Sequence, residues 1–313
     1  MKNRLFSIIG VILCFVMLLS ASSCSELLDL KNTEGETDEK ITLGDKNTEK
    51  PTQKKTEKKT EKKTEKKTEK QTEKQTEKAE TFKVRFASYN IYHAGNNKDL
   101  KKIAANITNN NIEIVGLQEV DNNTSRSGKV NQVKKLSELT GYQYYHFFKA
   151  IDHDGGQYGT AILSKYPIIE SNKINLYSGS GEQRVLGHCV IDVNGEEINF
   201  FVTHLSYDEE ANNKGKGYRE KQFTEVATEL AKYDNFVLSG DFNTRNLDEY
   251  NVIEGSALVN SKEDPKITYP DGRSPLDNLV YSTSTWKFDE INVVTQSYSD
   301  HYMIYADGTF TKK

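Results

Sequence analysis

Polar side chains that could bind a metal or a phosphate stand where apolar runs of this chain begin or end. The run VLSG, for example, is followed by Asp241 and, two residues later, by Asn243. A single residue of this kind is ordinarily a turn or a cap, but the pattern recurs at six boundaries. They hold Asn90, Glu119, Thr203 and His204, Asp241 and Asn243, Asp277 and Asn278, and Asp300 and His301. Because the strands of a sheet end along common edges, we expect these side chains to converge on one pocket.

The residue types favour a hard cation in that pocket. Converging carboxylates repel one another unless a cation compensates them. Oxygen-rich ligands without cysteine favour Mg²⁺, with Mn²⁺ or Ca²⁺ as alternatives, over zinc. Residues 81–313 carry 25 basic and 31 acidic residues, a formal net charge of −6. This acidic balance suits a cation site and lacks the electrostatic footprint of strong nonspecific nucleic-acid binding.

Periodic apolar residues predict the elements that would position these side chains in one α/β domain over residues 81–313. We expect strands at 82–91, 112–120, 142–148, 160–168, 188–193, 196–205, 235–240, 277–282, 290–296 and 301–306, and helices at 99–111, 132–141 and 218–233. The Asn194-Gly195 pair between two apolar runs is the strongest hairpin signal. Hairpins combined with helical crossovers predict mixed sheets with helices outside them.

The N-terminal residues 1–24 have the pattern of a secretory signal. Two basic residues precede an apolar run over residues 5–19 and then small residues. The run is too short and wrongly flanked for a stable membrane span. The sequence ASS before Cys24 resembles a bacterial lipobox, in which the cysteine is lipidated and becomes the new N-terminus. A plain signal peptide with an incidental Cys24 is the alternative interpretation.

Residues 25–80 are expected to form a disordered tether. They hold 15 Lys and 15 acidic residues, and from Lys54 they repeat KKTE and then KQTE. Each Glu faces another Glu four residues on, and the repeated Thr lowers helix propensity. No apolar face is available for burial, so a solvated chain with a reach of ~40 Å is expected. After the signal and Cys24, the one remaining thiol is Cys189, which we expect in the core.

The ordered motifs SYNI, LQEV, GGQYGTAILSKYP, VTHL, SGDFN, PLDNLVYS and SDHYMI resemble the endonuclease/exonuclease/phosphatase superfamily. The resemblance covers residues 82–306, and the complete set is far more specific than any one motif. It implies an α/β fold, a four-layer sandwich of two packed mixed β-sheets flanked by helices. Residues 81–313 would then form a divalent-metal-dependent catalytic domain, which we expect to be a monomer.

The resemblance also implies a set of metal-binding and substrate-binding residues. Glu119 would be the principal metal ligand, with Asn90 beside the metal and the phosphate. Asp300 would add a metal or outer-shell carboxylate. Arg184, in a Glu-x-Arg element of bacterial members, would bind a phosphate oxygen, or else form a surface ion pair. Tyr158, in the GGQYG segment, is a further candidate for substrate binding.

Five catalytic positions follow from the same resemblance. Asp241 would orient or deprotonate the attacking water, and Asn243 would hold that water or a phosphate oxygen. His301 would contact the scissile phosphate, with Asp277 fixing its ring orientation and charge. His204 would act on the opposite side of the phosphate. Whether Asp241 or His301 is the general base stays open at this point.

Two positions depart from the superfamily pattern. Tyr92 stands where the abasic-site branch carries an additional acidic residue, which disfavours that branch. Thr160 replaces a frequent asparagine, so an amide on the phosphate side is missing.

The function expected from the sequence is an envelope-tethered phosphoesterase. It would hydrolyse a phosphodiester by direct attack of activated water, and a lipid or small phosphodiester suits the acidic domain and the membrane anchor. One alternative is an extracellular endonuclease acting on DNA or RNA. Another is a non-catalytic lipoprotein that binds a phosphoryl ligand. The expected location is the bacterial cell envelope, lipid-anchored and extracytoplasmic or surface-exposed.

Overall fold

The computed structural model describes residues 80–207 and 217–313. The predicted signal peptide, Cys24 and the tether up to residue 79 lie outside the described residues, so they stay predictions. Among the described residues, no helix is both long and apolar enough to cross a bilayer.

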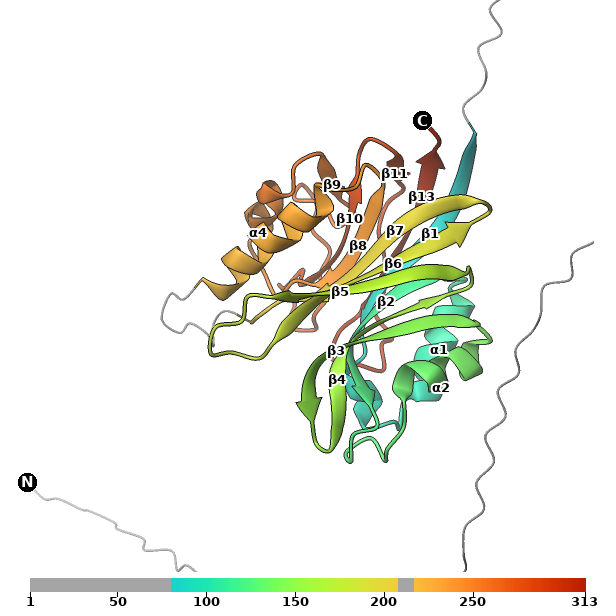
Figure 1. Cartoon of the computed structure of the whole chain (residues 1–313), viewed down its shortest axis with the longest axis vertical. Coiled ribbons are helices and arrows are strands. Elements are labelled where there is room, and N and C mark those ends of the chain that lie inside the picture. Colours follow the sequence, from blue (N-terminus) through green and yellow to red (C-terminus); the bar gives the residue numbers. More distant parts are fainter. Residues whose placement is uncertain (1–79, 208–216) are drawn as a thin grey trace, which may run out of the picture. The chain divides into compact units, whose positions relative to one another are not determined.

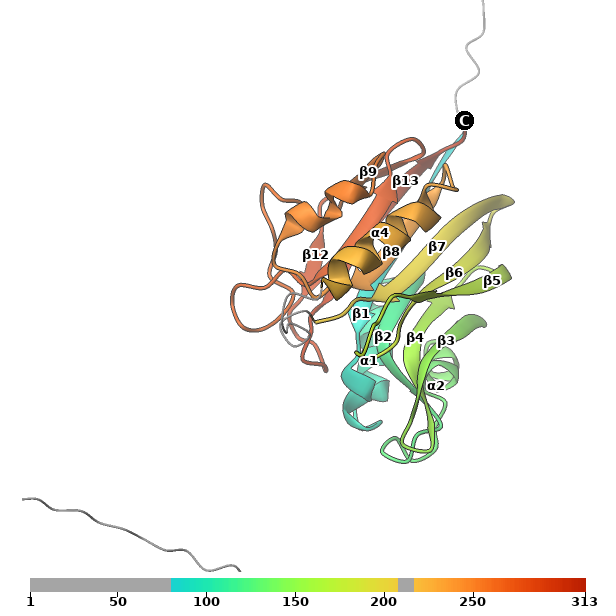
Figure 2. The same cartoon turned by 60° about the vertical axis from the view of Figure 1, so that its left-hand side comes forward.

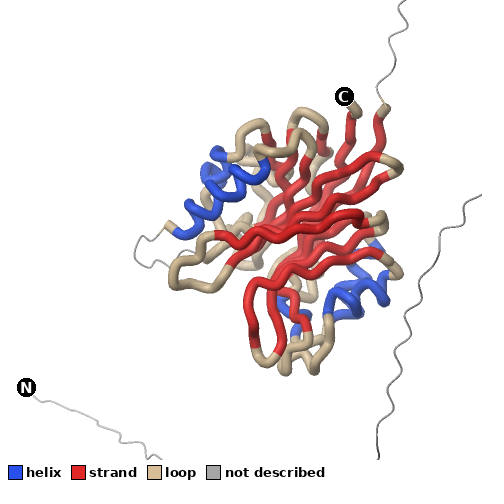
Figure 3. Tube along the Cα trace, viewed as in Figure 1, coloured by secondary structure: helices blue, strands red, loops and turns tan. Residues whose placement is uncertain are grey.

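Two mixed β-sheets dominate the described part of the chain (Figure 3). Sheet A has the strand order β11-β13-β1-β2-β4-β3, with β12 also paired to β13. Its strands are β1 (Thr81–Asn90), β2 (Ile114–Asn122), β3 (Tyr144–His153), β4 (Gly156–Ser164), β11 (Trp286–Phe288), β12 (Asn292–Val294) and β13 (Met303–Thr311). The β1–β2 pair is parallel and the other pairs are antiparallel.

Sheet B has the strand order β5-β6-β7-β8-β10-β9. Its strands are β5 (Ile168–Leu176), β6 (Arg184–Val193), β7 (Glu196–His204), β8 (Phe236–Asp241), β9 (Ser256–Leu258) and β10 (Asp277–Ser282). The β7–β8 pair is parallel because helix α4 (Tyr218–Leu230) forms the crossover between these strands, and the other pairs are antiparallel.

Three apolar cores divide the fold into four layers (Figures 1 and 2). The first core fills the space between the two sheets and includes Phe86, Phe200 and the buried Cys189. The second lies between sheet A and helices α1 (Leu100–Asn109) and α2 (Gln132–Thr140). The third lies between sheet B and α4 with the 3₁₀ turn η2 (Leu247–Val252). The predicted four-layer sandwich and the core position of Cys189 are therefore confirmed.

The structure corrects the sequence analysis at one strand boundary. The predicted strand over residues 160–168 is two strands, since β4 ends at Ser164 and β5 begins at Ile168 in the other sheet. Pro167 lies in the connection, where it lacks the N–H that a central strand would need. Strands β5, β9 and β11 were not predicted, because they are exposed or only three residues long and show no clear alternation.

The two sheets lie close together where Gly116 of β2 faces Ser239 of β8. A Cβ atom on Gly116 would lie 1.7 Å from Ser239 Oγ and 3.0 Å from Val202 Cγ2. We therefore expect Gly116→Ala to lower the free energy of unfolding by about 1–3 kcal/mol through overpacking, as measured by urea denaturation. Adding Ser239→Ala removes the worst contact and should restore part of the loss. Equal stability of wild type and Gly116→Ala would contradict the close approach.

Candidate active site

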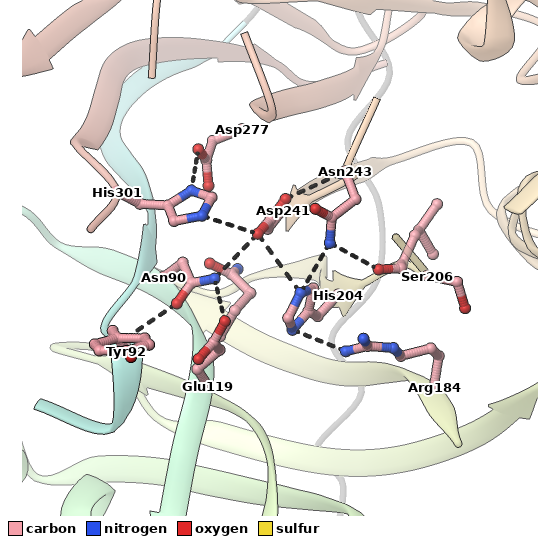
Figure 4. Close-up of polar contacts among 12 residues, drawn as sticks. Asn90, Tyr92, Glu119, Arg184, His204, Ser206, Asp241, Asn243, Asp277 and His301 are labelled. Atoms are coloured by element: carbon pink, nitrogen blue, oxygen red, sulfur yellow. Dashed lines mark hydrogen bonds and ion pairs between the residues drawn. The ribbon is translucent and has the colours of Figure 1, made fainter. Parts of the chain in front are cut away.

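The strand register of sheet B brings three of the expected catalytic residues together. His204 ends β7 and pairs with Asp241 at the end of β8. Asp277 opens β10 and pairs with Asp241 from the other side. From sheet A, the last residue of β1, Asn90, reaches the same point (Figure 4). Polar residues from strands far apart in sequence therefore meet at one edge of the sandwich.

Asp241 is the centre of this group. Its carboxylate accepts hydrogen bonds from Asn90 Nδ2 at 3.0 Å and from the Asn243 backbone N–H at 2.9 Å. The Nε2 atoms of His204 and His301 each lie 3.5 Å from Asp241 Oδ2. Burial raises the pKa of Asp241 to about 6, in spite of the positive charge of His301. The carboxylate is thus ionised at neutral pH and still basic enough to accept a proton.

Asn90 lies between two carboxylates. Its Nδ2 donates to Glu119 Oε1 and to Asp241 Oδ2, both at 3.0 Å, and its Oδ1 accepts from the Tyr92 backbone N–H. Glu119 interrupts the β2–β4 register and has a left-handed φ of +57°. Such a backbone is costly for a residue other than glycine and is concentrated at functional sites. The bulge turns the Glu119 carboxylate toward Asn90.

The donor set fits a divalent cation. Burial and the negative charges of Asp300 and Asp241 together raise the pKa of Glu119 to about 7, although the hydrogen bond from Asn90 opposes them. An excess of buried carboxylate charge is what a hard cation compensates. Glu119 and Asp300 would hold the ion, and Asn90 would do so if its amide turned its oxygen inward.

A second group of ligand atoms lies nearby. Ligand atoms of Asp241, Asp277 and His301 are within 4.8 Å of one another. Here, however, His301 Nδ1 is hydrogen-bonded to Asp277, and the charges of Asp277 and Asp241 raise the pKa of His301 to about 10, so the protonated ring has no lone pair for a metal. The carboxylates around Glu119 are therefore the better metal position.

Metal binding should depend on pH because protons compete for the Glu119 carboxylate. A raised pKa of about 7 means that the metal-free group is largely protonated below that pH. We expect Mg²⁺ affinity, measured by isothermal titration calorimetry, to fall about tenfold per pH unit below 7 and to level off above it. The variant Glu119→Gln should bind weakly at every pH. An affinity that stays constant between pH 5 and pH 8 would contradict this assignment.

His301 and Asp277 form a buried pair. His301 Nδ1 lies 2.8 Å from Asp277 Oδ2, and Thr268 Oγ1 accepts a hydrogen bond from the Asp277 backbone N–H. Burial favours the neutral ring, but the charges of Asp277 and Asp241 outweigh it and raise the pKa of His301 to about 10. The ring of Tyr269 packs edge-on against His301 with 5.0 Å between centroids. His301 is therefore an oriented cation at neutral pH.

His204 has the opposite character. Arg184 Nη1 lies 3.1 Å from His204 Nδ1, and Asn243 Nδ2 lies 3.0 Å from His204 Nε2. Burial, followed by the charges of Arg184 and His301, holds the pKa of His204 well below its usual range. One site thus contains a neutral and a charged imidazole.

Of the two contacts expected for Arg184, the structure shows the ion pair. Arg184 pairs with Glu182 at 3.1 Å while its Nη1 contacts His204, and its buried Nε has no hydrogen-bond partner among the described residues. The hydroxyl of Thr160 is likewise buried without a partner where the superfamily often has an amide.

The structure adds supporting residues that the sequence analysis did not name. Tyr269 contacts His301, and Ser299 Oγ donates to the Asn90 carbonyl at 2.7 Å. Arg219 Nη1 donates to the Asn243 carbonyl at 2.9 Å. Asn243 itself has a left-handed φ of +52°, so this contact helps to hold its loop. Ser299 opens the SDHYMI motif, but Tyr269 and Arg219 lie outside the quoted motifs, and the partners of all three are distant in the chain.

This combination of a four-layer sandwich and a buried Asn–Asp–His cluster beside excess carboxylates defines a phosphoesterase-type site. Comparison with known families agrees. The model of the endonuclease/exonuclease/phosphatase family matches residues 87–301, and the chain belongs to this family. Its members are metal-dependent hydrolases of phosphoester bonds. No match was found among curated proteins.

Solved structures share the fold at low sequence identity. A Bacteroides thetaiotaomicron protein of the same family superposes with a TM-score of 0.60 and 18% identity, covering 74% of this chain and 99% of that one. The mannosyl-6-phosphatase of the same species gives 0.58 and 18%, with 72% and 99% covered. TDP2 from D. rerio, solved with a single-strand DNA product, gives 0.57 and 17%, with 72% and 98% covered. At such identities the likeness establishes the fold and does not extend to the substrate.

Proposed function

We propose that this protein is a divalent-metal-dependent phosphodiesterase in which water attacks the phosphorus directly. The observation that carries the proposal is the Asp241 carboxylate, buried among Asn90, Asn243 and two histidines of different charge. No nucleophile is needed on the protein, because the side chains supply a base and hydrogen-bond donors.

Asp241 is the proposed general base. A pKa of about 6 leaves it ionised at neutral pH, whereas His301, with a pKa of about 10, is already protonated and cannot accept a proton. This contrast favours Asp241 for the role that the sequence left open between them. The backbone N–H of Asn243 donates a hydrogen bond to the Asp241 carboxylate, which fixes Asn243 at the end of β8. From this position the Asn243 side chain would orient the water.

The donors are placed for the charge that develops on phosphorus-bound oxygens. His301 presents Nε2–H while Asp277 holds Nδ1, and Arg184 adds a positive charge beside His204. Such preorganised donors stabilise a transition state without reorganisation at the moment of reaction. A cation held by Glu119 and Asp300, when bound, would offset charge on the phosphate and on the departing oxygen.

We further propose that the domain acts at the bacterial envelope through a lipid on Cys24 and the tether, with a lipid or small phosphodiester as substrate. The acidic balance of residues 81–313 supports this choice over nucleic acid. Replacing Cys24 with alanine should move the protein from the detergent-extracted membrane fraction to the soluble fraction, as measured by immunoblotting. Retention in the membrane fraction would contradict lipidation at Cys24.

The decisive experiment is a parallel hydrolysis screen with Mg²⁺, Mn²⁺ and Ca²⁺. The substrates are bis(p-nitrophenyl) phosphate, sphingomyelin, phosphoinositides, plasmid DNA and RNA. We expect metal-dependent hydrolysis of the activated diester and of a lipid or small diester. Cleavage of nucleic acid alone would replace the lipid proposal by the endonuclease alternative. Absence of all hydrolysis, with phosphoryl-ligand binding unchanged in Asp241→Asn, would favour a binding protein.

A further inference from the structure

Arg126 is fixed beside the site by a fully buried carboxylate. Asp121 is 0% exposed and accepts hydrogen bonds from Arg126 Nε at 2.8 Å and Nη2 at 2.7 Å. Thr124 Oγ1 and Ser127 Oγ donate to the same carboxylate. These bonds lower the pKa of Asp121 although burial opposes the shift. A bidentate contact of this kind sets the orientation of the guanidinium plane.

The remaining nitrogen of Arg126 is unused. Nε and Nη2 of Arg126 bind Asp121, whereas Nη1 makes no hydrogen bond within the described residues. The Arg126 side chain is 27% exposed. The guanidinium carbon lies 5.5 Å from the ring centre of Tyr158. Tyr158 pairs directly with Asp121 across β2 and β4, so their side chains point to the same face of sheet A. The Tyr158 hydroxyl also has no hydrogen-bond partner in the described part of the chain.

Arg126 lies beside the proposed metal site because its partner Asp121 stands two residues after Glu119 on β2. The hydrogen bond with Asp121 and the charges of Asp121 and Glu119 all raise the pKa of Arg126. Burial raises the pKa of Tyr158, Glu119 raises it further, and both Arg184 and Arg126 oppose this shift. Arg126 is thus the guanidinium that packs on Tyr158, whereas Arg184 contacts His204. The proposed hydrolysis uses Arg184 and leaves Arg126 without a role.

We propose that Arg126, together with the Tyr158 hydroxyl, binds a second phosphate group of the substrate beside the scissile phosphodiester. The inference rests on the proposed function, which places the scissile phosphate at Asp241. Guanidinium N–H groups in a fixed plane suit phosphate oxygens, and Asp121 holds the plane before substrate arrives. In line with the proposed function, this second phosphate is one on the sugar of a lipid headgroup, and the neighbouring phosphate of a nucleic acid is the alternative that the test distinguishes.

Two matched pairs of substrates test the subsite and distinguish its sources. The first is thymidine 5′-(p-nitrophenyl phosphate) with and without a 3′-phosphate, and the second is glycerophosphoinositol with and without a 4-phosphate. Within each pair the broken bond and the leaving group are the same. The wild type should prefer the second-phosphate member in at least one pair, and that pair identifies the source. Arg126→Gln should reduce this kcat/KM preference by about 10- to 100-fold, as for a lost hydrogen bond to a charged group.

Control variants separate the subsite from folding. Arg126→Lys keeps a positive charge near Asp121 but loses the planar guanidinium, so its kcat/KM preference for the second-phosphate substrate should lie between those of wild type and Arg126→Gln. Arg85 makes a similar bidentate pair with Asp307 elsewhere in sheet A, and Arg85→Gln should keep the full preference. No preference in the wild type, or an unchanged one in Arg126→Gln, would overturn the proposal.

A binding measurement keeps the subsite testable if neither pair is hydrolysed. That result would contradict the proposed function and leave the subsite to be judged on affinity alone. Wild type should then bind thymidine 3′,5′-bisphosphate or inositol 1,4-bisphosphate more tightly than the matching monophosphate by calorimetry. Arg126→Gln should remove the difference. Equal affinities in the wild type for both pairs would refute the subsite.

Discussion

Asp241→Asn is expected to lower kcat on an activated phosphodiester by about 10²- to 10⁴-fold, the usual contribution of a general base. The substitution keeps the shape of the side chain, but its single oxygen can accept only one of the two hydrogen bonds, which Asn90 gives to Oδ2 and the Asn243 backbone N–H gives to Oδ1. It removes the charge and the proton-accepting capacity. Steady-state kinetics at saturating metal would measure the loss.

The pH profile of the wild type provides an independent check of the same role. A base with a pKa of about 6 is ionised above that pH, so kcat at saturating metal should rise about tenfold per unit up to pH 6 and then level off. The kcat of Asp241→Asn should not show this rise between acidic pH and pH 6. As a control, Asp248→Asn neutralises an exposed carboxylate on η2 and should retain wild-type kcat. A kcat for Asp241→Asn within threefold of wild type would eliminate Asp241 as the base.

His301→Gln is expected to lower kcat by about 10²- to 10³-fold, as for the loss of a preorganised transition-state donor. Glutamine offers a neutral N–H near the phosphate and cannot reproduce the cation that Asp277 and Asp241 maintain. His146→Gln on β3 is the matched control, since His146 packs against Phe148 and lies outside the site. Its kcat should not change.

The pairing of His301 with Asp277 predicts strong non-additivity. Asp277 acts on the reaction through the His301 ring, with which it forms a hydrogen bond of 2.8 Å. Once His301 is glutamine, adding Asp277→Asn should therefore change kcat by less than about threefold, although Asp277→Asn alone should cost much more. Fully additive losses in the double variant would show that Asp277 contributes independently, for example by holding a metal.

Local sequence patterns were sufficient for the main elements. The apolar positions of the predicted helix at 99–111, including Ile103 and Ile107, are the buried face of α1. Asn194 and Gly195 both have positive φ between β6 and β7, as a two-residue hairpin requires. These features depend on residues close together in the chain, so the sequence displays them directly. The ordered motifs likewise indicated the family.

Tertiary structure decided how the site residues are used. His204 and His301 are the same residue type at similar strand boundaries, yet one is held neutral and the other charged. The difference comes from Arg184 beside one ring and Asp277 beside the other, and no local pattern encodes those contacts. The sequence indicated which side chains could carry phosphate chemistry. Their protonation, the turning of Glu119 on its bulge and the position of Arg126 over Tyr158 follow from burial and from strands paired across the fold.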